Sequence, residues 1–65
     1  GTGGTERPAP QEVIPVVVKF GDALARAGQP DVARAQYDLA IRMARQTGLP
    51  DLEALARERR AALGP

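Results

Sequence analysis

Arginines and carboxylates carry nearly all the chemistry that this sequence offers. The chain has 65 residues, of which nine are basic and eight acidic, and it contains no Cys and no His. Ser is also missing from the sequence, so the usual nucleophile–base pairs cannot form. The carboxylates, the only strong metal ligands left, occur singly along the chain. We therefore expect neither an enzyme nor a metal or cofactor site.

The arginines of the second half are a candidate basic patch. Guanidinium groups bind phosphates and carboxylates, and six of them are concentrated here: Arg34, Arg42, Arg45, Arg57, Arg59 and Arg60. Acidic residues alternate with them, and the net charge is only +1. We therefore expect a solvated face. The alternative is a small three-helix nucleic-acid-binding domain, which would need base-reading side chains beside a basic stripe.

Proline and glycine divide the chain into three expected helices, which together predict an all-α, three-helix domain. The first should begin within 11–15 and end near Ala27, because Pro15 is harmless only in a first turn and Gly28 favours a left-handed end. The second should run from Pro30 or Asp31 to Gln46, before Gly48. The third should run from Pro50 or Asp51 to Leu63. The short connections make neighbouring helices antiparallel.

Apolar residues recur at helical spacing in each segment and predict the buried faces. The predicted stripe of the first helix contains Val13, Val17, Phe20, Gly21 and Leu24. That of the second contains Ala33, Tyr37, Ala40, Ile41 and Ala44, with Tyr37 as a core residue. That of the third contains Leu52, Leu55, Ala56 and Ala62 or Leu63. Three pairs of opposite charge at i,i+4 should add local support: Asp22–Arg26, Asp38–Arg42 and Glu53–Arg57.

The stretch before the first helix has a different composition. Residues 1–10 are rich in Gly, Thr and Pro and contain no large apolar side chain. They predict a flexible linker or an expression remnant, which leaves 11–65 as the domain. No apolar run is long enough to cross a bilayer and no signal peptide is evident, so we expect a cytoplasmic protein without a membrane partner.

The segment from about Ile14 to Thr47 resembles one tetratricopeptide repeat, a helical hairpin of 34 residues. The residues that carry the resemblance have the spacing of the repeat signature: Phe20-Gly21, Leu24, Gly28, Ala33, Tyr37 and Ala40. Small residues would let the two helices approach, and Phe20, Leu24 and Tyr37 would fill the space between them. Three positions depart from the pattern, with Val17 for Trp, Leu24 for Tyr and Arg45 for Pro. The third helix resembles the solvating helix that closes such arrays.

The resemblance implies a peptide-binding surface on the concave side of the first helix. Carried over to this sequence, its positions are Pro15, Val18, Asp22, Ala25 and Arg26. Val16, Val17 and Val18 point in three directions about 100° apart on a helix, so at least one should be exposed or buried in an interface. We therefore expect a partner-binding site comprising Val16, Val18, Asp22, Ala25 and Arg26.

The sequence thus predicts a protein–protein docking module that belongs to a larger assembly. A single hairpin of this kind leaves one face uncovered, because repeat arrays normally need about three repeats to be stable. The partner would be a helix or peptide of another protein, or a second copy of the chain. A weaker resemblance to microtubule-interacting-and-transport domains, which also bind helical peptides, implies the same kind of partner.

Overall fold

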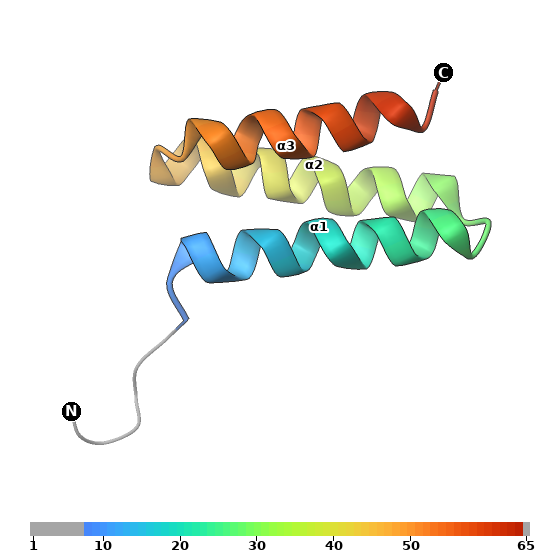
Figure 1. Cartoon of the computed structure of the whole chain (residues 1–65), viewed down its shortest axis with the longest axis horizontal. Coiled ribbons are helices and arrows are strands. Elements are labelled where there is room, and N and C mark those ends of the chain that lie inside the picture. The colour runs from blue at the N-terminus through green and yellow to red at the C-terminus, as the bar shows by residue number, and fades with distance from the viewer. Residues whose placement is uncertain (1–7, 65) are drawn as a thin grey trace.

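The chain folds into three α-helices, as the sequence predicts (Figure 1). The computed structural model describes residues 8–64, and within them the elements are α1 (Pro10–Arg26), α2 (Pro30–Thr47) and α3 (Pro50–Ala62). Each helix has a proline in its first turn, where the missing N–H costs no hydrogen bond. No strand occurs in this part of the chain.

Glycines end the first two helices in the same way. Gly28 and Gly48 have φ values of +78° and +68°, which side chains disfavour. The amide of Gln29 donates to the carbonyl of Leu24, and that of Leu49 donates to the carbonyl of Ala44, both over 2.9 Å. These bonds satisfy carbonyls that a helix end otherwise leaves unpaired. The predicted helix boundaries are therefore correct to within a residue or so.

The N-terminal boundary lies earlier than predicted, because α1 already begins at Pro10. Pro15 therefore lies inside the helix, and the expectation that it belongs to the first turn is wrong. Residues 8–9 precede the helix in the described structure. The expectation of a linker over residues 1–10 falls mainly on residues 1–7, which lie outside the described residues.

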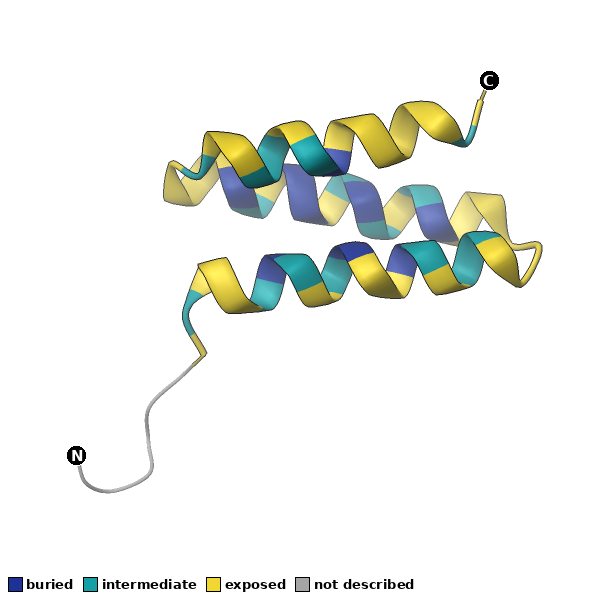
Figure 2. Cartoon of the chain, viewed as in Figure 1, coloured by how far each residue is buried: buried dark blue, intermediate teal, exposed yellow. Residues whose placement is uncertain are grey.

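α2 is the central helix of the domain. It packs along both neighbours, whereas α1 and α3 touch each other only slightly. In Figure 1, α1 and α3 lie at the two edges and α2 lies behind and between them. The shortest dimension of the Cα trace is 13 Å, so the helices form a thin stack and most of α1 and α3 is solvent-accessible on one side (Figure 2).

The core is a single cluster that α2 dominates. All five residues predicted for its buried stripe are buried: Ala33, Tyr37, Ala40, Ile41 and Ala44. α1 contributes Ile14, Val18 and Gly21, and α3 contributes Ala56. The leucines of α3, with Leu24, are partly buried against this cluster. Alanines at so many core positions let the helices approach closely, since little side-chain volume separates them.

The predicted buried stripe of α1 is wrong in one important member. Phe20 is 53% exposed and does not fill the space between α1 and α2. The side chains in that space are Ile14 and Val18, which are 0% and 2% exposed. Gly21 is buried as predicted, and Val17 and Leu24 are partly buried against the core. The core face of α1 is therefore rotated away from Phe20, toward Ile14 and Val18.

Gly21 is the point of closest approach between α1 and α2. A Cβ atom placed there would lie 2.6 Å from Cε1 of Tyr37 and 2.9 Å from its Cδ1. The tyrosine ring therefore lies directly on the backbone of α1. A side chain at position 21 would have to displace a ring that is 2% exposed.

No helix within residues 8–64 combines the length and the apolar composition that a membrane-spanning helix needs.

Candidate interaction surfaces

Four large apolar side chains are exposed in the described part of the chain, two on α1 and two on α2. They are Val16 (63%), Phe20 (53%), Val32 (44%) and Leu39 (38%). We call these exposed apolar residues of the hairpin the open face and include in it Val13 and Met43, which are only partly buried. The open face is formed by the α1–α2 hairpin alone.

The helical repeat places the open face opposite α3. On α2, Asp38 and Arg45 reach α3 through their ion pairs with Arg60 and Glu53. At about 100° per residue, Val32, Leu39 and Met43 come out on the other side of α2. On α1, Asp22 reaches α3 through Arg59, and Phe20 lies about 160° away from Asp22 around the helix. α3 therefore covers one side of the hairpin and leaves the other uncovered.

The outer side of α3 and the open face differ in character. The outer side of α3 presents Asp51, Ala54 and Glu58, all exposed and all small or charged. The open face presents Val and Leu side chains and an aromatic ring. The outer side of α3 is thus a solvated surface, whereas the open face exposes apolar side chains.

The structure separates the residues predicted to bind a partner. Val16 lies on the open face and is the most exposed of the large apolar residues. Val18 is 2% exposed and belongs to the core, so its placement on an accessible surface is wrong. Ala25 is partly buried against the core, and Arg26 is exposed in the last turn of α1. These residues do not form one surface.

Asp22, the fifth of these residues, has partners other than the expected one. Its Oδ1 accepts a hydrogen bond of 2.5 Å from the Tyr37 hydroxyl. Its Oδ2 accepts one of 2.6 Å from Nη1 of Arg59. Both carboxylate oxygens are therefore used to join α1 to α2 and α3, and the predicted pair with Arg26 is replaced by these longer-range contacts. Asp22 is a positioning residue within the fold.

The environment of Tyr37 raises the pKa of its phenol to about 12. Burial is the main cause, because it disfavours the charged phenolate. The hydrogen bond to Asp22 and the negative charge of that carboxylate act in the same direction. Tyr37 is thus a neutral hydrogen-bond donor within the core, as its predicted core position implies.

The sequence reasoning missed Phe20, Val32 and Leu39 as surface residues. α1 carries two apolar stripes, one through Ile14, Val18 and Gly21 and one through Val13, Val16 and Phe20. The two stripes together are wider than one neighbouring helix can cover. This width was the feature of the sequence that could have predicted an exposed apolar side. Val32 and Leu39 lie on α2 beside its buried stripe, and both are exposed.

A second surface feature lies between α2 and α3, on the side of α2 away from α1. It is an open groove of about 600 Å³, which we call the arginine groove. Its lining residues are Ala35, Asp38, Ile41, Arg42, Arg45, Arg57, Arg60 and Ala61. Four arginines from two helices therefore surround a groove that contains one lining carboxylate.

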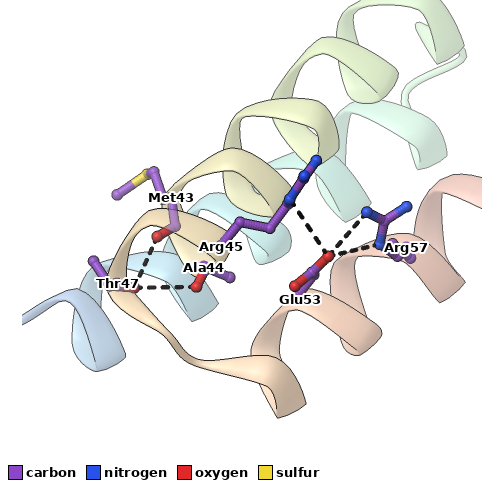
Figure 3. Close-up of polar contacts among 6 residues, drawn as sticks. All are labelled: Met43, Ala44, Arg45, Thr47, Glu53 and Arg57. Carbon is purple, nitrogen blue, oxygen red and sulfur yellow. Dashed lines mark hydrogen bonds and ion pairs between the residues drawn. The ribbon is translucent and has the colours of Figure 1, made fainter.

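Carboxylates neutralise part of this groove. Nε of Arg57 donates a hydrogen bond of 3.0 Å to Oε2 of Glu53, and Nη2 of Arg57 lies 2.9 Å from the same oxygen, so this ion pair forms as the sequence predicts. Nε of Arg45 lies 3.9 Å from the same oxygen, so both arginines are directed at Glu53 (Figure 3). Asp38 pairs with Arg60 at 2.5 Å instead of with Arg42, so that predicted pair is wrong. Among the ion pairs of residues 8–64, Arg42 has no carboxylate partner.

Similarity to known proteins does not assign a role to either surface. No protein-family model, no curated protein and no solved structure matches this chain.

Proposed function

We propose that this chain is a protein–protein docking module that binds an amphipathic helix on its open face. The observation that carries the proposal is the position of the exposed apolar side chains. Val16, Phe20, Val32 and Leu39 are exposed on the α1–α2 hairpin, and the helical repeat directs them away from α3. Exposed apolar surface of this kind is typical of interaction sites.

The surface suits a helix as its ligand. It consists of apolar side chains from two antiparallel helices, and a third helix packs against such a hairpin by ridges into grooves. α3 already packs against the same hairpin, mainly through α2. The resemblance to a tetratricopeptide repeat supports the proposal, because such repeats are covered by neighbouring helices on both sides.

We take a second copy of this chain as the helix donor. α1 itself carries an apolar stripe that a partner surface of this type accepts, through Val13, Val16 and Phe20. Most oligomers of soluble proteins are homo-oligomers with two-fold symmetry. A domain of this length also has a small core, to which self-association would add buried apolar surface. The larger assembly is then built by the chain pairing with itself.

Charge along the stripe favours an antiparallel pair of α1 helices. Glu12 and Lys19 are both exposed, have opposite sign and flank Val16 on the same side of the helix. They are seven positions apart, or about 10 Å along the helix axis. When two α1 helices pack antiparallel with Val16 against Val16 of the second copy, Glu12 of each chain comes level with Lys19 of the other.

Sedimentation equilibrium of the whole chain tests this function. The wild-type chain should be dimeric at micromolar concentrations. Val16→Asp should be monomeric with an unchanged circular dichroism spectrum, because it places a charge in the apolar contact. Ala54→Asp, on the exposed outer side of α3, is the matched control and should remain dimeric. A chain that is monomeric at all concentrations would exclude a second copy as the occupant.

Reversal of charge tests the proposed orientation. Glu12→Lys and Lys19→Glu should each weaken the dimer severalfold, because each sets two like charges side by side. The double variant restores opposite charges and should recover most of the affinity. If the effects of the two changes simply add, the two residues do not face each other across the interface.

A further inference from the structure

We propose that the arginine groove between α2 and α3 is a second binding site, which takes an acidic peptide segment with an aliphatic side chain. This inference is independent of the open face. It rests on the groove, its charges and its apolar floor, which lie on the side of α2 away from α1.

The charges of the groove are not balanced within the chain. Arg42, Arg45, Arg57 and Arg60 line it, and Asp38 is the one carboxylate among its lining residues. Arg60 is bound by Asp38 and Arg57 by Glu53. Arg45 shares Glu53 at the longer distance of 3.9 Å, and Arg42 has no carboxylate in any ion pair of the described chain. Arg42 and Arg45 therefore retain donors for an incoming anion.

Spacing makes these two arginines suitable for one ligand. They are three positions apart on α2, so their side chains emerge as neighbours on the same side of the helix. Each guanidinium presents several N–H donors in a plane and binds carboxylates through two of them. A segment with two or more acidic side chains can therefore bind both arginines at once.

The remaining lining residues of the groove are apolar, and they restrict the kind of ligand that can bind. Ile41 is 8% exposed, and Ala35 and Ala61 are small residues on either side of the groove. This floor accepts an aliphatic side chain but provides no aromatic surface on which a nucleic-acid base could stack. Asp38 also opposes a ligand with a continuous run of phosphates. In a peptide that combines carboxylates with an aliphatic residue, the carboxylates can bind the arginines and the aliphatic side chain can contact the apolar lining.

The test is fluorescence anisotropy of the 65-residue chain with a labelled peptide that is rich in Glu and has a central Leu. Binding should weaken as salt is added. Arg42→Gln should reduce the affinity roughly five- to tenfold, because one charge-assisted contact is lost. Arg26→Gln is the matched control. It removes an exposed arginine of α1 and should leave the affinity unchanged.

Three results would overturn the proposal. The first is no binding of the peptide at low salt. The second is an equal loss with Arg26→Gln, which would mean that overall charge alone is responsible. The third is tighter binding of a random DNA duplex that displaces the peptide and depends on Arg42, which would make the groove a phosphate site. Val16→Asp should not alter peptide binding, so failure of this site and failure of the open face are separable.

Discussion

Tyr37 links all three helices through a short series of contacts. Its ring lies on Gly21 in α1, and its hydroxyl donates to Asp22, whose second oxygen binds Arg59 of α3. The core position of Tyr37 was predictable from its spacing on α2. Its hydrogen bond was not, because Asp22 is 15 residues away along the chain and Arg59 is 37 residues from Asp22. At the residue scale, burial follows local periodicity, whereas polar partners depend on tertiary packing.

Gly21→Ala should destabilise the domain by about 1–3 kcal/mol through overpacking. The added Cβ would lie 2.6 Å from Cε1 of Tyr37, and this ring cannot move freely because its hydroxyl is bound to Asp22. Urea denaturation measures the change.

Helix propensity acts in the opposite direction, since Ala is favoured over Gly by about 1 kcal/mol in a helix. Ala23→Gly, two positions away and exposed, calibrates that contribution on the same helix. A stabilised Gly21→Ala variant would contradict the close packing of α1 and α2.

The single tyrosine makes the stability of the domain depend on pH in the alkaline range. The pKa of Tyr37 is raised from 10.0 in the unfolded reference to about 12 in the fold. The neutral phenol therefore contributes stability that is fully present below about pH 10 and is lost as the pH rises toward 12, at about 1.4 kcal/mol per pH unit. Tyr37→Phe should abolish this part of the dependence.

Ultraviolet absorbance measures the titration directly, because Tyr37 is the one tyrosine of the chain and Trp is absent. Asp22→Asn should lower the pKa of Tyr37, since it removes the nearby negative charge and leaves the burial. A tyrosine that titrates near its ordinary value in the folded wild-type protein would contradict the buried, hydrogen-bonded environment.

The helices themselves were largely predictable from the sequence. Proline at the start of each helix and Gly28 and Gly48 at the ends of α1 and α2 set boundaries that the structure reproduces. The buried face of α2 was also predictable, because its polar residues leave one apolar stripe. α1 was harder, since apolar residues occupy two of its sides. Which side is core depends on how α1 packs against α2, and that is a tertiary property.

Two neighbouring valines separate the two sides of α1. Val18→Asp should destabilise the domain by more than about 3 kcal/mol, because it buries an unpaired carboxylate in a core site that is 2% exposed. Val16→Asp should change the free energy of unfolding by no more than about 0.5 kcal/mol, because Val16 is 63% exposed.

Chemical denaturation at a concentration where the chain is monomeric measures both variants. Equal destabilisation by the two substitutions would contradict the assignment of Val18 to the core and of Val16 to the surface.

At the scale of the whole molecule, two surfaces of the domain differ in character. The outer side of α3 presents small and charged residues, whereas the α1–α2 hairpin leaves Val16, Phe20, Val32 and Leu39 exposed. The prediction of a docking module anticipated an uncovered side of the hairpin. It placed that side at Val16, Val18, Asp22, Ala25 and Arg26. Of these, Val16 belongs to the open face, and the other four are concave positions that the resemblance implies.

The most direct test of the open face is a dilution series of the isotopically labelled chain, followed by nuclear magnetic resonance of its backbone amides. The signals of Val16, Phe20, Val32 and Leu39 should shift together as the protein is diluted and the second copy leaves. Those of Ala54 and Glu58, on the outer side of α3, should stay in place. Signals that do not depend on concentration, or shifts centred on α3, would contradict homotypic docking through the open face.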